Sequence, residues 1–151
     1  MIKILWVAAL AAPLITIGPP TSAQEHVATL TGVATVQDGD GVLFGQVEVR
    51  LQGIAAPEMR DPMGPESYQG LFELANGKEV VCHLDGSTAG RSKRPVGVCY
   101  VGDTDLGMAQ IEAGLARDCP KYSKGRYRDV EISAQHQGRD LSAIYDLPGY
   151  C

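Results

Sequence analysis

The amino-acid sequence predicts an α+β protein, mainly β, in which five strands close a small barrel and three helices accompany it. Runs rich in β-branched residues alternate with turns rich in Gly, Pro and Asp. Apolar residues recur at helical spacing once after the third strand and twice after the fifth. A chain of 151 residues with 44% hydrophobic and 21% charged side chains can form one folded domain, which excludes a disordered or collagen-like chain.

The first three predicted strands share a high content of β-branched residues and occupy residues 26–37, 42–44 and 47–54. The turn Asp38-Gly39-Asp40-Gly41 ends the first strand. Gly45-Gln46 joins the next two as a hairpin, with glycine first as a type II′ turn requires. Alternation in the third strand places Arg50 on the face opposite its apolar residues.

The second half of the chain predicts three helices and two more strands. They lie, in order, at residues 64–78 (helix), 78–84 and 95–102 (strands), and 106–116 and 127–141 (helices). Asn76-Gly77 ends the first helix, and Asp105 can cap the second. A loop is expected at residues 119–125.

The N-terminus has the three parts of a secretory signal peptide, namely a lysine, an apolar core and small residues before a cleavage site. We expect cleavage after residue 23 and a mature domain over residues 24–151, in a secreted or periplasmic protein of bacterial type. An uncleaved membrane anchor is the alternative, but the core is short and Pro13 interrupts it. We therefore expect no membrane association after cleavage, and a monomer.

Four cysteines in an exported chain indicate two disulfides. Cys82 and Cys99 lie in two strand-like runs joined by a polar turn, so a cross-strand bridge is the simplest pairing and leaves Cys119 with Cys151. Structural zinc is the alternative interpretation, but no CxxC or HxxxH spacing is present.

The charge of the chain is segregated along the sequence. Residues 24–151 hold 12 basic and 18 acidic side chains, a net charge of −6, so their overall field does not attract nucleic acid. Residues 91–128 nevertheless carry a net charge of +4. This segment is either an ordinary solvated face or a local track for a phosphate backbone that includes Arg91 and Lys93.

Several common motifs are absent. An EF-hand loop starting at Asp38 would need glycine at Leu43 and glutamate at Val49. Neither a phosphate-binding Walker loop nor a GxSxG nucleophile elbow occurs. What remains is a set of four charged groups near strand ends, Asp40, Arg50, Glu58 and Arg94. Guanidinium groups can neutralise a phosphodiester, and carboxylates can orient water or hold a hard cation.

The segments DGDGVLFGQVEVRLQGIAAPE, RPVGVCY and DLGMAQIEAGLARDCPKYS resemble the staphylococcal nuclease (thermonuclease) family in order and spacing. The similarity extends from about residue 28 to residue 140. It implies an OB-type five-stranded barrel with three helices and calcium-dependent hydrolysis of phosphodiester bonds in DNA and RNA.

The resemblance also implies roles for matching residues. Arg50 would bind the phosphate and stabilise the transition state, and Glu58 would act as the general base or as a carboxylate that orients water. Arg94 would stabilise charge and assist the leaving group, Asp40 would be a calcium ligand, and Tyr122 would contact a nucleotide.

One departure concerns the metal. Ala55 stands where the family has a second metal-binding aspartate, and Ala56 stands where a threonine supplies its carbonyl. Fewer carboxylates weaken calcium binding. Two hypotheses follow: a nuclease that binds calcium or another divalent metal weakly, or a degenerate module that binds single-stranded nucleic acid or a protein partner without cutting.

Overall fold

A computed structural model describes residues 28–151, and the predicted signal peptide lies outside the described residues. The described strands are β1 (Ala28–Val33), β2 (Thr35–Val36), β3 (Gly41–Phe44), β4 (Val47–Leu51), β5 (Ile54–Ala55), β6 (Glu79–Ala89), β7 (Arg94–Val101), β8 (Thr104–Asp105) and β9 (Arg117–Asp118). The helices are α1 (Gly64–Ala75), α2 (Leu106–Glu112), α3 (Pro120–Ser123), α4 (Arg128–His136) and the 3-10 turn η1 (Leu141–Ala143). The α+β class is therefore confirmed.

The sheet differs from the closed five-stranded barrel that the sequence predicts. Its hydrogen-bonded order is β1-β6-β7-β4-β3-β2, with β8 added to β7, and β5 and β9 form a separate pair. The predicted first strand divides at Ala34, whose N–H donates to the Lys78 carbonyl at 3.0 Å and whose carbonyl accepts from Gly77 N at 2.8 Å. Its two halves, β1 and β2, pair with β6 and β3 and lie at the two ends of the hydrogen-bonded order, which is open.

The strands that carry the candidate site pair at the centre of this sheet. β3 and β4 form the predicted hairpin, and Gly45 between them has the positive φ, 64°, that its turn requires. β4 pairs with β7 in parallel, with Arg50 opposite Val96. Strand β7 thus brings Arg94, at its start, to the neighbourhood of β4.

The three predicted helices are present, with one addition. The predicted loop at residues 119–125 contains α3, a single turn that begins at Pro120 and ends at Ser123, and its C-cap, Lys124, has a φ of 52°. A helix this short has too few residues to show the recurring apolar spacing from which helices are predicted. Helix α4 ends at His136, earlier than predicted, and Leu141 belongs to η1 instead.

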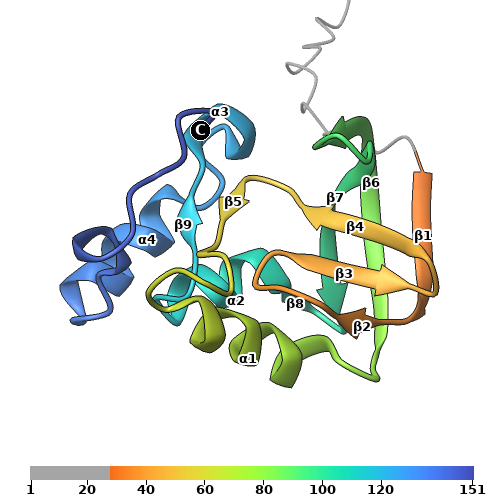
Figure 1. The fold of residues 1–151 in the computed structure, drawn as a ribbon, viewed down its shortest axis with the longest axis horizontal. Helices are drawn as coiled ribbons and strands as arrows, with labels where there is room; N and C mark the ends of the chain where they lie inside the picture. The colour runs from red at the N-terminus through yellow and green to blue at the C-terminus, as the bar shows by residue number, and fades with distance from the viewer. Residues whose placement is uncertain (1–27) are drawn as a thin grey trace, which may run out of the picture.

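The helices and the core lie on one side of the sheet. Figure 1 shows α1 and α2 beside the sheet, with α3, α4 and the C-terminus gathered next to β9. Buried Val49, Leu51, Leu71 and Ile111 belong to one core cluster, which joins the sheet to α1 and α2. Within residues 28–151, no helix has the length and apolar character needed to cross a membrane.

Both inferred disulfides are confirmed. Cys82 and Cys99 are direct cross-strand partners of β6 and β7, with their Cα atoms 4.0 Å apart. Cys119, before α3, pairs with Cys151 at the end of the chain, with a Cα–Cα distance of 4.9 Å. The second bridge ties the C-terminal residues to the end of β9, beside the candidate site described next.

Candidate functional site

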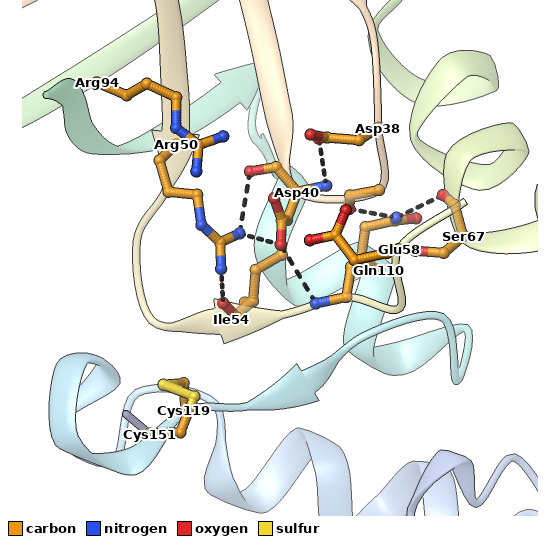
Figure 2. Close-up of polar contacts among 12 residues, drawn as sticks. Asp38, Asp40, Arg50, Ile54, Glu58, Ser67, Arg94, Gln110, Cys119 and Cys151 are labelled. Carbon is orange, nitrogen blue, oxygen red and sulfur yellow. Dashed lines mark hydrogen bonds and ion pairs between the residues drawn. A yellow bond between two sulfur atoms is a disulfide. The ribbon is translucent and has the colours of Figure 1, made fainter. Parts of the chain in front are cut away.

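Arg50 and Asp40 form an ion pair at the centre of the candidate site. Only 9% of Arg50 is exposed, and its guanidinium also donates to the Asp40 carbonyl at 3.4 Å and to the Ile54 carbonyl at 3.1 Å. Figure 2 shows this fork between the turn before β3 and the start of β5. The predicted polar face of β4 is thus a partly buried, charged face.

Buried polar contacts hold the turn that carries Asp40. The Asp40 N–H donates to Asp38 Oδ1 at 3.2 Å, and Gln110 Nε2 of α2 donates to the Gly39 carbonyl at 2.9 Å. Gln110 Nε2 also donates to the Ser67 carbonyl of α1 at 2.8 Å. Gln110 is completely buried, so the turn is fixed to both helices.

Burial dominates the electrostatics of Asp40. Desolvation raises the pKa of its carboxyl group to about 6, with Arg50 opposing the shift and the Asp38 carboxylate adding to it. A hydrogen bond from Ala56 N to Asp40 Oδ2, at 3.4 Å, favours the charged form. The Asp40 carboxylate therefore interacts with a guanidinium, that of Arg50, and with a second carboxylate, that of Asp38.

Arg94, at the start of β7, is the second arginine of the candidate site. Its Nη1 forms an ion pair with Glu48 Oε1 at 2.5 Å. Glu48 and Arg50 project from the same face of β4 because they are two residues apart. Desolvation opposes the charged form of Arg94, but Glu48 above all, and then Asp40 and Asp38, raise its pKa. Glu48 was not a predicted site residue, although its alternation with Arg50 would have identified it.

Glu58 lies on the loop that follows β5 and is exposed to solvent. A tight turn holds its backbone, because the Glu58 N–H donates to Asp61 Oδ2 at 3.3 Å and its carbonyl accepts from Asp61 N at 2.8 Å. A Cβ atom at Gly64 would collide with the Glu58 carbonyl, so only glycine permits this close approach. In Figure 2 the Glu58 side chain is drawn beside Asp40 and Gln110.

A further residue, Tyr145, reaches the site from the C-terminal segment. Its hydroxyl donates to the Ala56 carbonyl at 3.1 Å. Desolvation, then the neighbouring Tyr150 and the carboxylates of Asp40 and Glu58, raise the pKa of Tyr145 to about 12, and Arg50 partly opposes this. The sequence contains no signal for this contact, which joins residues 89 positions apart.

The residues predicted to contact nucleic acid are exposed and lie on two segments, the β6–β7 turn and α3. Arg91 and Lys93 are exposed in the β6–β7 turn, next in sequence to Arg94. Tyr122 is 46% exposed on α3, and Lys121 Nζ lies 5.3 Å from the centre of its ring. Helix α3 follows Cys119, whose N–H donates to the Gly53 carbonyl, so Tyr122 belongs to an element attached to the end of β4.

Two arginines of the basic segment form ion pairs with acidic side chains. Arg117 is held by Glu131, with Nε and Oε1 3.2 Å apart, and Arg126 lies 3.5 Å from Asp105 Oδ2. These two guanidinium groups therefore have structural partners within the described residues. Arg91 and Lys93 remain the exposed basic groups next to Arg94 in sequence.

The oxygen donors suited to a metal ion are few. They are the Asp38 and Asp40 carboxylates and the Ala56 carbonyl, whereas Ala55 contributes no side-chain ligand. Among residues 28–151, no three His, Cys, Asp or Glu side chains form a group able to hold a metal ion. This donor set fits a weakly held hard cation and not a tightly bound one.

Comparison with known protein families gives one match. Residues 48–141, more than half of the chain, match the family model described as staphylococcal nuclease homologue. A search of curated proteins finds no match. The matched range includes Arg50, Glu58 and Arg94, but it begins after Asp40 and ends before Tyr145.

Proposed function

The chain belongs to the staphylococcal nuclease homologue family, and from this premise we propose that it hydrolyses phosphodiester bonds in DNA or RNA. One observation carries the proposal: Arg50 of β4 pairs with Asp40, and Arg94 of β7 pairs with Glu48 and also interacts electrostatically with Asp40. Guanidinium groups held in this way match the charge and the forked geometry of a phosphodiester.

The two arginines bind and neutralise the scissile phosphate. Arg50 is rigid because its guanidinium has acceptors at Asp40 and Ile54, whereas Arg94 has one ion pair, with Glu48, and is more accessible. Preorganised positive charge stabilises a phosphorane-like transition state because the groups need little reorganisation during reaction. Arg94 also stabilises the departing oxygen.

Glu58 is the general base. Its carboxylate is exposed at the edge of the site, where it can accept a proton from a water molecule that attacks the phosphorus atom. The Asp61 turn fixes its backbone while leaving the side chain accessible. A partner that only bound phosphate would gain nothing from a negative group at this position.

A divalent cation, expected to be calcium, would be held by Asp40 with help from Asp38 and the Ala56 carbonyl. When bound, such a cation supplies Lewis-acid polarisation of the phosphoryl oxygen. We propose weak binding, because Ala55 removes one carboxylate and Arg50 already pairs with Asp40.

The substrate is proposed to be a single strand. Arg91 and Lys93 offer charge to its backbone, and the exposed ring of Tyr122 offers a surface on which a base can stack. No groove that would read a base sequence is needed for this mode of binding. Export of the mature domain, residues 24–151, as a monomer to the periplasm or medium is also proposed, and its two disulfides support an oxidising location.

The second candidate is a binding module that lacks catalysis. The presence of Ala55 favours it, as does the satisfaction of Asp40 by Arg50 and Ala56 without a metal. Such a module would keep its affinity for single strands when Glu58 is changed.

The deciding experiment compares the exported wild-type protein with Glu58→Gln on single-stranded DNA and RNA, while calcium, manganese and magnesium are titrated separately. We expect metal-dependent cleavage that falls by a factor of about 100 or more in Glu58→Gln. Glu66→Gln, another exposed acidic residue, is the matched control and should retain wild-type cleavage. Strand binding without cleavage by the wild-type protein in any metal would assign the chain to the binding modules.

A further inference from the structure

The C-terminal segment, residues 141–151, supplies a side chain to the loop between β5 and Glu58. The Tyr145 hydroxyl donates to the Ala56 carbonyl at 3.1 Å, and the Ala56 N–H donates to Asp40 Oδ2 at 3.4 Å. The backbone of Ala56 is therefore held from both sides, by the carboxylate of the buried ion pair and by the tyrosine. Nothing in the family match covers this contact, because the matched residues end at position 141.

Three interactions hold Tyr145 in place. Arg117 Nη1 donates to the Tyr145 carbonyl at 3.1 Å, while Arg117 Nε is fixed by Glu131. The Tyr145 N–H donates to the Leu141 carbonyl at 2.9 Å. Beyond Tyr145, the Cys119–Cys151 disulfide closes the segment onto the residue that precedes α3. The segment is thus a covalently closed strap with Tyr145 near its middle.

The contact lies two residues before Glu58. Pro57, between them, is fully buried, and its ring restricts its φ. The orientation of the Ala56 peptide therefore influences the backbone position of Glu58. Glu58 itself is exposed, and its carboxylate interacts electrostatically with Tyr145. Its backbone position depends on the Asp61 turn on one side and on the Ala56 peptide on the other.

We propose that Tyr145 is a positioning residue for Glu58, and that the Cys119–Cys151 disulfide keeps Tyr145 in contact with the Ala56 carbonyl. The proposal rests on the proposed function, since the alignment of Glu58 matters for attack on a phosphate bound at Arg50 and Arg94. Tyr145 does not touch the reacting atoms. It acts through residues 56–58.

The test compares Tyr145→Phe with Tyr68→Phe in the exported full-length product. Tyr68 lies on α1, outside the strap, which makes it the matched control. Hydrogen exchange is measured for the amides of residues 54–58 and, as an internal reference, for those of the β6–β7 pair. We expect exchange in residues 54–58 to quicken roughly three- to tenfold in Tyr145→Phe, since one net hydrogen bond is lost, with no change in the reference amides.

Cleavage kinetics provide the second readout. In Tyr145→Phe, kcat should fall about tenfold while KM stays at the wild-type value, because substrate binding is intact and the base is misaligned. Unchanged exchange in residues 54–58 overturns the proposal, and so does a raised KM with unchanged kcat, which would mean direct substrate contact. If the wild-type protein cleaves nothing, the proposed function fails, and the exchange measurement still decides whether Tyr145 holds these residues.

The role of the disulfide is tested by Cys119→Ser/Cys151→Ser, which leaves Cys82–Cys99 intact. This variant should reproduce the faster exchange of residues 54–58. Adding Tyr145→Phe to it should have little further effect, because the two changes remove the same contact. Fully additive effects would show that the disulfide does not hold Tyr145 and would overturn that half of the proposal.

Discussion

At the level of single residues, the most consequential feature is the depth of Arg50. Its alternation with apolar neighbours on β4 predicts the face on which it lies, but not that this face is covered by the Asp40 turn and by β5. Because the Arg50–Asp40 pair is buried, substitution of either partner should destabilise the fold, since it leaves the other charge desolvated and unpaired. Arg50 is therefore both a candidate phosphate ligand and a part of the fold.

Replacing Arg50 with Lys should destabilise the protein. The guanidinium spans Asp40 and the Ile54 carbonyl, which a single ammonium cannot do. We expect the free energy of unfolding to fall by about 1 to 3 kcal/mol, as measured by urea unfolding. Arg60→Lys, at an exposed position, is the control and should change little. Equal stability of both variants would mean that the Ile54 contact contributes nothing.

The charged side chains of the candidate site are predictable from the sequence, but the residues that hold their backbone in place are not. The residue types and spacing around Asp40, Arg50, Glu58 and Arg94 suggest phosphate chemistry. Gln110 and Tyr145 cannot be predicted, because each donates to a backbone carbonyl. Every residue type has such a carbonyl, so the sequence of the partner gives no indication of the contact. Glu48 could have been found, since it shares a strand face with Arg50.

At the level of elements, capping of α2 links the helix to the last part of the chain. Asp105 is its N-cap, as the sequence predicts, and accepts from Met108 N at 3.0 Å. The same carboxylate accepts from the buried Tyr127 hydroxyl, with each oxygen 3.2 Å away. One side chain thus fixes both the start of α2 and the approach to α4.

The Tyr127–Asp105 contact predicts a pH-dependent stability. Burial raises the pKa of Tyr127 well above its ordinary value of 10.0, so the folded protein keeps a proton that the unfolded chain releases above about pH 10. The stability of the wild-type protein should therefore fall as the pH rises above 10. Tyr127→Phe should lower the free energy of unfolding by about 1 to 2 kcal/mol at neutral pH. Because the variant has no hydroxyl to ionise at this position, it should not show the decrease in stability above pH 10 that Tyr127 causes.

Urea unfolding at neutral and alkaline pH measures this effect. The difference in unfolding free energy between the wild-type protein and Tyr127→Phe should narrow above pH 10. Tyr150→Phe serves as the control, because its ring is half exposed and should leave the pH dependence unchanged. A constant difference across the pH range would contradict the assigned cause.

For the whole molecule, the two disulfides have different consequences. Cys82–Cys99 joins the neighbouring strands β6 and β7, whereas Cys119–Cys151 joins the C-terminal strap to the end of β9. The first bridge lies inside the core cluster, far in sequence from the candidate catalytic residues of β4 and the Glu58 loop. Its removal should therefore affect stability more than chemistry.

The variant Cys82→Ala/Cys99→Ala should unfold at lower urea concentration. A loop of 17 residues corresponds to about 3 kcal/mol of chain entropy in the unfolded state. We expect the loss of stability to be of that size, while kcat and KM remain close to wild type at temperatures where the variant is folded. A loss below about 1 kcal/mol would show that pairing of β6 and β7 alone is sufficient.

The sequence by itself determined the α+β class, the β3–β4 hairpin and the ends of α1 and α2, and it identified the charged residues of the candidate site. These follow from periodicity, turn chemistry and chain order, all of which are local. Only the tertiary structure decided that the sheet stays open, that Arg50 is buried against Asp40, and that Tyr145 meets Ala56 across 89 residues. Periodicity specifies which face a side chain occupies, but depth and backbone contacts depend on what the rest of the chain packs onto that face.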